Sequence, residues 1–247
     1  MKKFARIIAL VMAVALMATL FASCKKEDNV LKMGTNAAFP PYEYYEGDKI
    51  VGIDAEIGAL IAKKLDMELE IVDMDFNGII AAVQNGSIDM GMAGMTKDPD
   101  REKSVNFSTS YATGVQVVIV KEGSAIKSID DLKGKKIGVQ EATTGDSYAT
   151  SDFGEEAVKR YVNGAAAVQD LQNGSIDAVI IDNEPAKAFV AANEGLTILE
   201  TEYTVEEYAI AVSKDDPELL EKINKAIAEL KEEGKIDEII NKYIPAE

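Results

Sequence analysis

Two apolar runs of the chain end at charged residues with complementary chemistry. Thr96 and Arg101 follow the run 88–93, and Asp182 follows the run 178–181. Arginine offers a planar fork of donors that suits a carboxylate, and an aspartate at the rim of a core can pair with an ammonium group. These residue types could hold a zwitterion by its two charged ends. The alternatives are that Arg101 is a solvated surface residue and that Asp182 caps a helix.

Other residues could complete such a site. Thr143 and Thr144 precede a predicted helix, where their hydroxyl and N–H groups could bind an anion or simply cap the helix. Phe39 lies in a Pro-Pro loop outside any periodic element, which favours a pocket wall, whereas Phe76 begins a predicted helix and could belong to the core. Ligands of open α/β sheets lie beyond the carboxyl ends of strands, where all these residues fall.

The elements that must position these residues occur twice. The hexapeptide Gln-Asn-Gly-Ser-Ile-Asp stands at 84–89 and at 172–177, each time after a helix-like run and before a strand-like run. Asn-Gly commonly ends a helix, because both residues tolerate the left-handed conformation, so the two copies could have arisen independently. We interpret them as the same turn in two similar lobes with a cleft between them.

Apolar periodicity predicts alternating strands and helices in both halves. Strands are predicted at 30–35, 69–72, 88–93, 136–140, 158–162 and 178–181. Helices are predicted at 54–65, 77–84, 128–134, 164–172 and 184–192 and from Pro217 onward, and 36–52 is a loop with a hairpin tip at Gly47-Asp48. The alternation indicates two α/β lobes with largely parallel sheets. Residues after Tyr208 are expected to return to the first lobe, so that two strands cross between the lobes as a hinge.

Composition excludes several kinds of chemistry. The chain has no histidine and one cysteine, so Ser-His-Asp and Cys-His nucleophiles, histidine metal sites and intramolecular disulfides are ruled out. It has no Walker-type loop and no Gly-x-Gly-x-x-Gly motif after a strand. We therefore expect neither a metal nor a cofactor. The formal net charge of −17 argues against nucleic acid as a partner and suits docking on a basic protein.

The first 23 residues have the pattern of a secretory signal. Lys2, Lys3 and Arg6 precede an apolar run that is short for a membrane span. The following Phe21-Ala22-Ser23-Cys24 resembles the processing motif of bacterial lipoproteins, with Phe where Leu is usual; an ordinary signal with an incidental cysteine is the alternative. We expect lipidation at Cys24. Removal of the signal would leave 224 residues with a formal charge of −20, anchored at the outer face of the cell membrane.

A set of motifs resembles the polar amino-acid-binding proteins of bacterial ABC importers. In chain order they are Gly34-Thr-Asn-Ala-Ala-Phe-Pro-Pro-Tyr-Glu43, Val51-Gly-Ile-Asp54, Met74-Asp-Phe-Asn-Gly-Ile-Ile80, Ala93-Gly-Met-Thr96 with Arg101, Val139–Gly145 and Ile181-Asp182. The resemblance implies a bilobal, venus-flytrap fold of the periplasmic-binding-protein type, with two α/β lobes joined by two hinge strands. The expected limits are 1–23 for the signal, 24–29 for the lipidated Cys24 and linker, 30–112 with 208–247 for lobe 1, and 113–207 for lobe 2.

The resemblance also implies roles for individual residues. Arg101, Thr96 and the Thr143–Thr144 loop would hold the α-carboxylate of an amino acid. Asp182, the Gly94 carbonyl and the Thr96 hydroxyl would hold its α-ammonium. Family members that bind basic amino acids often carry Asp at the Asn36 position, so Asn36 leaves polar and basic ligands both open. The implied ligand-binding residues are Asn36, Phe39, Phe76, Ala93, Gly94, Thr96, Arg101, Gln140, Thr143, Thr144 and Asp182, with Tyr42, Glu43 and Tyr44 expected at the cleft mouth.

We therefore expect a non-enzymatic, monomeric, extracytoplasmic lipoprotein that captures a free polar or basic L-amino acid and delivers it to an ABC permease. One alternative is a ligand-sensing lipoprotein, which would need a separate signalling partner. Another is an enzyme on the same fold that resembles cyclohexadienyl dehydratases. Glu141 is then the candidate acid, although we expect this residue to face solvent.

Overall fold

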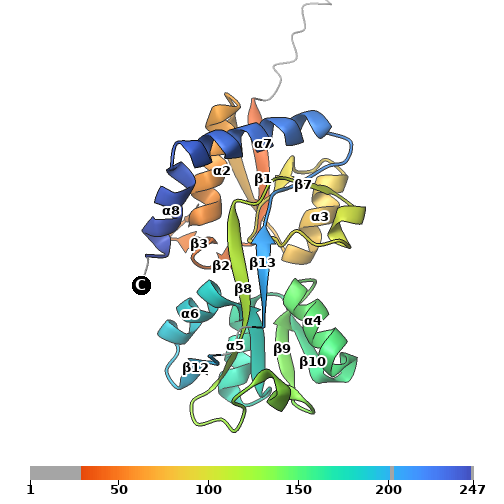
Figure 1. Ribbon diagram of the computed structural model, residues 1–247, viewed down its shortest axis with the longest axis vertical. Helices are drawn as coiled ribbons and strands as arrows, with labels where there is room; N and C mark the ends of the chain where they lie inside the picture. The colour runs from red at the N-terminus through yellow and green to blue at the C-terminus, as the bar shows by residue number, and fades with distance from the viewer. Residues whose placement is uncertain (1–28, 201–202, 246–247) are drawn as a thin grey trace, which may run out of the picture. The chain divides into compact units, whose positions relative to one another are not determined.

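The computed structural model describes residues 29–200 and 203–245. The predicted signal and Cys24 lie outside the described residues. None of the helices in the described ranges has the length and apolar character needed to cross a membrane. From Leu31 onward the chain forms two large sheets and one small one, and strands β8 (Ala112–Lys121) and β13 (Thr204–Tyr208) run from the second large sheet towards the first (Figure 1).

The first sheet has the strand order β5-β1-β6-β14-β7. Strand β1 pairs in parallel with β6, and β14 pairs antiparallel with β6 and β7. Because β14 follows β13, the chain returns to the first sheet, as the sequence predicts. The strands are β1 (Val30–Thr35), β5 (Glu68–Asp73), β6 (Met90–Gly91), β7 (Asn106–Phe107) and β14 (Ala211–Val212), and the helices around them are α2 (Ile53–Lys64), α3 (Phe76–Gln84), α7 (Pro217–Glu232) and α8 (Lys235–Tyr243).

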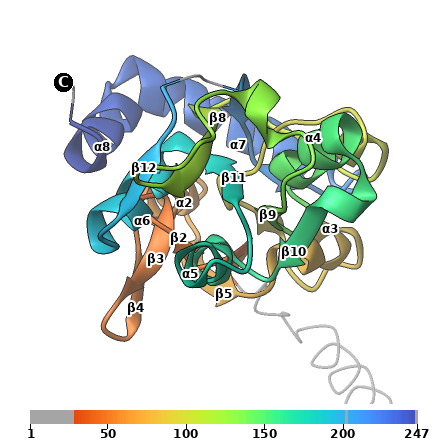
Figure 2. The same cartoon turned by 90° about the horizontal axis from the view of Figure 1, so that it is seen from below.

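The second sheet has the order β10-β9-β11-β8-β12, with β13 also paired to β8. Seen from below, β9 and β11 lie between α4 and α5 (Figure 2). The strands are β9 (Ile137–Gln140), β10 (Val158–Tyr161), β11 (Ala178–Asp182) and β12 (Leu196–Ile198). The helices are α4 (Thr144–Phe153), α5 (Gly164–Asn173) and α6 (Asn183–Ala192), with short 3₁₀ turns η2 (Ile129–Leu132) and η3 (Glu155–Ala157). A further 3₁₀ turn, η1 (Arg101–Lys103), packs on β7 of the first sheet.

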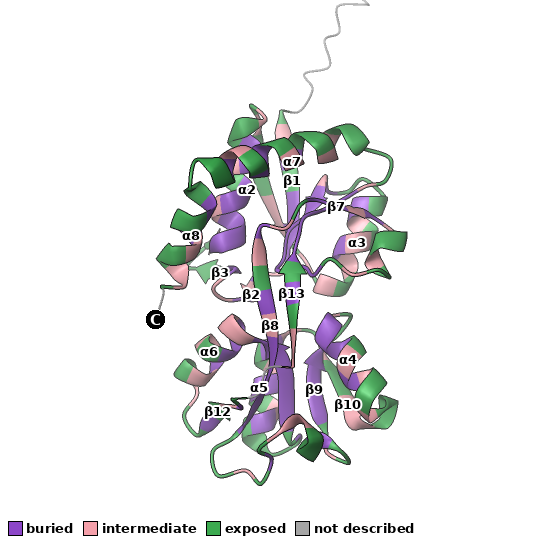
Figure 3. Cartoon of the chain, viewed as in Figure 1, coloured by how far each residue is buried: buried purple, intermediate pink, exposed green. Residues whose placement is uncertain are grey.

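Strand β11 shows how both faces of the second sheet are buried. Ala178 and Ile180 belong to the same apolar cluster as Ala149 of α4, whereas Val179 and Ile181 cluster with Leu171 of α5. Successive side chains of a strand point to opposite faces, so one apolar strand serves both helices. The central strands β9 and β11 are accordingly buried along their whole length, whereas the edge strand β10 is partly exposed (Figure 3). Their ends are therefore the places where polar side chains can reach a ligand.

The repeated hexapeptide forms the same contact in both halves. The Asp89 carboxylate accepts the Lys32 N–H at 2.7 Å, and the Asp89 N–H donates to the Lys32 carbonyl at 2.9 Å. Asp177 and Lys136 repeat this pair, with both distances 2.8 Å. Gly86 and Gly174 have φ values of 73° and 76°, the left-handed conformation that glycine adopts without strain. The interpretation of the repeat as one turn used twice is confirmed.

Several local expectations differ from the structure. The predicted helix 128–134 is the 3₁₀ turn η2. The expected loop 36–52 contains a small antiparallel sheet of β2 (Ala38–Phe39), β3 (Glu43–Glu46) and β4 (Lys49–Val51). Strand β6 is shorter than the run 88–93 and spans Met90–Gly91. The chain turns further on at Gly94, which adopts φ 51° and whose N–H donates to Asp54. Both sheets are mixed rather than largely parallel. In the first, β14 pairs antiparallel with β6 and β7. In the second, β8 enters the lobe and pairs antiparallel with β11, β12 and the departing hinge strand β13.

The predicted lobe limits, 112/113 and 207/208, fall inside β8 and β13. Strands of the first sheet come from residues before β8 and after β13, and strands of the second come from the chain between these points. We keep these limits as a proposal.

Candidate ligand-binding site

A cavity lies where strand ends of the first and second sheets meet. Its volume is about 330 Å³. Its walls are formed by every ligand-binding residue expected from the sequence, with one addition, Glu43. The lining residues are Asn36, Phe39, Glu43, Phe76, Ala93, Gly94, Thr96, Arg101, Gln140, Thr143, Thr144 and Asp182.

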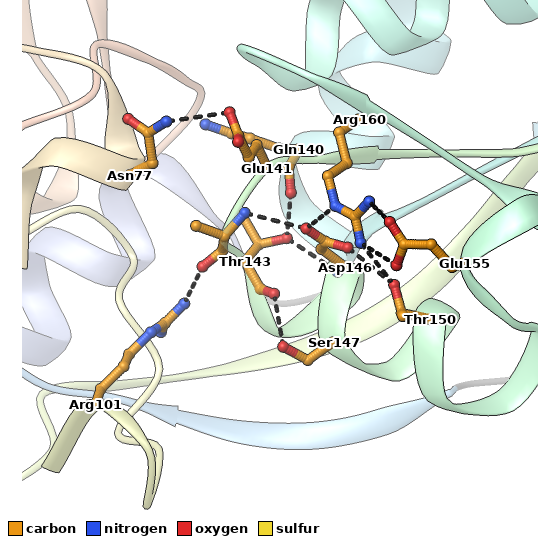
Figure 4. A network of polar contacts seen from close by, with 11 residues as sticks. Asn77, Arg101, Gln140, Glu141, Thr143, Asp146, Ser147, Thr150, Glu155 and Arg160 are labelled. Carbon is orange, nitrogen blue, oxygen red and sulfur yellow. Dashed lines mark hydrogen bonds and ion pairs between the residues drawn. The ribbon is translucent and has the colours of Figure 1, made fainter. Parts of the chain in front are cut away.

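Arg101 lies at the start of η1 and points towards the loop that carries Thr143 (Figure 4). Its Nη1 donates to the Thr96 carbonyl at 2.8 Å, and its Nη2 donates to the Ala142 carbonyl at 3.0 Å. The guanidinium lies over the Phe76 ring, 5.2 Å from its centroid. Burial lowers the pKa of Arg101, but an arginine keeps its charge. These contacts hold a cation in the cavity wall, unlike those of a solvated surface arginine.

The loop before α4 is held by its own hydrogen bonds. The Thr143 hydroxyl donates to the Gln140 carbonyl at 2.8 Å and accepts the Asp146 N–H at 3.2 Å, so the capping alternative is correct for this side chain. Asp146 in turn pairs with Arg160 at 2.8 Å (Figure 4). The first N–H groups of a helix have no partner inside it, so the N–H of Thr144 is suited to bind an anion.

Asp182 ends β11 and is only 8% exposed. Among the described residues its side chain makes no capping bond to α6, so the capping alternative is wrong. The Tyr208 hydroxyl donates to it instead. Burial raises the pKa of Asp182 to about 7, a shift that the Tyr208 hydrogen bond opposes and the negative charge of Glu206 reinforces. A cationic group beside Asp182 would restore the ionised form.

Glu43 is the lining residue that the sequence placed only at the cleft mouth. It is 1% exposed, and neither of its oxygens accepts a hydrogen bond from a donor group in the described part of the chain. Burial and the adjoining Asp54 carboxyl, with which it can share a proton, raise the pKa of Glu43 well above its usual value. The predicted hairpin tip at Gly47-Asp48 implies a strand before it, and that strand is β3. Its pairing with β2 places Glu43 opposite Phe39.

Glu141 does not line the cavity. It is exposed, and its carboxylate accepts the Asn77 side-chain amide at 3.1 Å (Figure 4). The expected position near solvent is confirmed, and the candidate acid of the enzyme alternative lies away from the cavity. At the side-chain end of the expected site, Gln140 Nε2 donates to Asn36 Oδ1 at 2.9 Å.

Two lobes joined by two hinge strands, with a charged cavity where their strand ends meet, define a hinged solute-binding protein. Residues 31–246 match the bacterial extracellular solute-binding proteins, family 3, and the chain belongs to that family. It is an extracytoplasmic, substrate-binding component of an amino-acid ABC importer.

The relatives that it resembles are binding proteins. The arginine-binding extracellular protein ArtP of Bacillus subtilis (strain 168) is 36% identical over 222 residues, which cover 88% of this chain and 87% of ArtP. The L-arginine-binding protein of Pseudomonas aeruginosa is 32% identical, with 98% and 96% covered. A solved ancestral arginine-binding protein bound to arginine has a TM-score of 0.82 and 43% identity, with 87% of this chain and 98% of the ancestral chain covered.

Proposed function

We propose that the ligand is L-arginine. The observation that carries this proposal is the second buried carboxyl group of the cavity, Glu43, in addition to Asp182. The two charges of any α-amino acid match Arg101 and Asp182, which leaves Glu43 as a buried, protonated carboxyl group beside Asp54. A cationic ligand side chain would favour the ionised form of Glu43, which would then be its counter-charge.

A guanidinium fits the rest of the cavity better than an ammonium group does. It is planar and carries five N–H donors, whereas the lysine ammonium carries three. The side-chain oxygens of Asn36, Glu43 and Gln140 offer acceptors for these donors, and the rings of Phe39 and Phe76 offer faces for a planar cation. The arginine-binding relatives agree with this choice.

L-glutamine is the second candidate. The amide pair between Asn36 and Gln140 could recognise a side-chain amide. An ancestral arginine-binding protein has also been solved bound to glutamine, with a TM-score of 0.84 and 42% identity to this chain.

Binding would work by closure of the two lobes. The Arg101 guanidinium already joins Thr96 of one lobe to Ala142 of the other. Because residues of both lobes line the cavity, the lobes would separate to admit an amino acid, and closure would then desolvate Arg101 and Asp182 around its opposite charges. The closed form would be the one that docks, as a monomer, on the permease.

Calorimetry with L-arginine, L-lysine and L-glutamine tests the proposal, together with the variant Glu43→Gln. We expect this change to weaken L-arginine binding about 30-fold or more, because it removes the counter-charge of the guanidinium. L-glutamine binding should change by less than about threefold. Glu46→Gln on the same strand is the matched control, because Glu46 is exposed. Equal losses for L-arginine and L-glutamine would contradict the assignment of Glu43, and tighter binding of L-glutamine by the wild type would overturn the choice of ligand.

We also propose that Cys24 is the lipid attachment site. Its position directly after an Ala-Ser pair at the end of the signal supports this, as does the need to retain a binding protein near its permease. We expect the wild type to partition into detergent and Cys24→Ser to stay in the aqueous phase of the same cells. Aqueous partitioning of both proteins would argue for an ordinary cleaved signal.

A further inference from the structure

We propose that Glu206, which accepts hydrogen bonds from residues of both lobes, positions the two threonine hydroxyls of the site. Glu206 belongs to hinge strand β13 and is 4% exposed. It lies behind the cavity wall, since it is not a lining residue. Its Oε2 accepts hydrogen bonds from Thr96 Oγ1 at 3.1 Å, Gln116 Nε2 at 2.9 Å and Thr144 Oγ1 at 3.0 Å, and its Oε1 accepts from the Tyr148 hydroxyl at 2.9 Å.

These bonds decide what the threonine hydroxyls offer to a ligand. A hydroxyl has one proton to donate and two lone pairs that accept. Because Thr96 and Thr144 both give their proton to Glu206, their oxygens can only accept hydrogen bonds from the cavity. The Thr96 oxygen is thereby set to accept an α-ammonium N–H. The α-carboxylate is left to Arg101 and to the N–H of Thr144.

The same carboxylate connects segments that belong to different lobes. Thr96 follows β6 of the first sheet, whereas Thr144 and Tyr148 belong to α4, which packs on the second. Gln116 lies on the other hinge strand, in register with Asp182. A movement of one lobe relative to the other must therefore change the contacts of Glu206. In the lobe arrangement of this structure, Glu206 makes all four of the hydrogen bonds described above.

The negative charge of Glu206 acts electrostatically on both charged residues of the site, Arg101 and Asp182. It favours the charged form of Arg101 and disfavours ionisation of Asp182. A ligand ammonium placed beside Asp182 lies in the field of both carboxylates. Charge-assisted hydrogen bonds are about twice as strong as neutral ones, so a carboxylate orients the two hydroxyls more firmly than an amide.

The inference depends on amino-acid binding between the lobes and not on the choice of L-arginine. Its test compares L-arginine with 5-guanidinopentanoate, which is arginine without the α-amino group. The variants are Glu206→Ala, Glu206→Gln and the control Glu207→Gln, which changes the exposed neighbour on the same strand. Affinities are measured by calorimetry, with displacement for weak ligands, and urea denaturation shows that each variant folds.

We expect Glu206→Ala to weaken L-arginine binding by about 100-fold, because the freed hydroxyls can rotate and point protons at the ammonium. Glu206→Gln should lose about tenfold, since its amide oxygen can replace Oε2 without the charge. Neither variant should lower affinity for the des-amino analogue by more than about threefold, and Glu207→Gln should match the wild type within about twofold. Equal losses for both ligands would mean that Glu206 only supports the fold, and unchanged L-arginine binding would also overturn the proposal.

The role of Glu206 can be tested even if the proposed ligand is wrong. If the wild type binds L-glutamine and not L-arginine, the arginine proposal fails, and L-glutamine with its des-amino analogue then tests Glu206 in the same way. If Glu206→Ala does not fold, the comparison of Glu206→Gln with Glu207→Gln decides.

Discussion

Replacement of Arg101 by alanine will abolish amino-acid binding at any practical concentration. Loss of one partner of a buried, hydrogen-bonded charge pair costs about 2–5 kcal/mol, which is roughly a 30- to 5,000-fold loss of affinity. We expect the upper part of that range. The guanidinium is the cation of the cavity wall, and it also bonds Thr96 on one side and Ala142 on the other. The variant therefore loses both the carboxylate partner and a contact between the lobes.

Calorimetry with L-arginine and L-glutamine measures this loss. Arg101→Lys separates charge from geometry, and we expect it to recover less than a tenth of the lost affinity, because a lysine cannot form two parallel bonds to a carboxylate. Lys103→Ala is the control, since Lys103 is exposed in the same 3₁₀ turn and pairs with Asp100. Affinity within a few-fold of the wild type in Arg101→Ala would show that the α-carboxylate binds elsewhere.

The expected ligand-binding residues could be placed together from the sequence because each one follows a strand or begins a helix. In a parallel arrangement, such positions gather at one edge of a sheet, whatever the distance between them in the chain. The resemblance to amino-acid-binding proteins rests on motifs that contain these residues and that follow one another in the family's order. The structure places all of them around one cavity. The side-chain roles within it stay predictions.

Glu43 and Glu206 could not be predicted in the same way. Glu43 belongs to a hairpin inside an apparently irregular loop, and only the pairing of β3 with β2 brings it beside Phe39. Glu206 and Glu207 are adjacent and chemically identical. The pleat of β13 buries Glu206 with Tyr208 and leaves Glu207 exposed. A residue two positions before the apolar Tyr208 falls on the same face of a strand, which was the available sign that Glu206 is buried. That sign can be used only once it is known that β13 is a strand paired with β8.

The repeated hexapeptide predicted more of the fold than any single motif. Its aspartates, Asp89 and Asp177, fix the start of the strand that follows against β1 or β9 in the same way. It could not predict that the second sheet would be mixed. Whether the strands of the second sheet run parallel or antiparallel depends on the two hinge strands. Neither hinge strand belongs to a copy of the repeat.

Asp182→Asn will weaken amino-acid binding by about 100-fold and will remove most of its pH dependence. The carboxylate is buried, so its loss leaves the ligand ammonium without a full counter-charge. In the free protein the pKa of Asp182 is raised to about 7. A bound ammonium favours the ionised form and lowers that pKa, so ligand binding releases a proton when the pH is below about 7. Wild-type affinity should therefore be constant above about pH 8 and fall by up to about tenfold per pH unit below pH 7.

Calorimetry from pH 5.5 to 8.5 in buffers of different ionisation enthalpy measures both the affinity and the proton released. The asparagine variant should give a nearly flat profile, which assigns the titration to Asp182 rather than to Glu43 or Glu206. Tyr208→Phe tests the same titration in the opposite way, by changing the pKa of Asp182 instead of removing its carboxyl group. Tyr208 donates a hydrogen bond that opposes the raised pKa of Asp182. Its loss should raise the pKa of Asp182 further, so the affinity should level off at a pH above the wild-type value of about 8. A wild-type profile that survives in Asp182→Asn would place the proton on another carboxyl group, and Glu43, buried beside Asp54, would then be the residue to replace next.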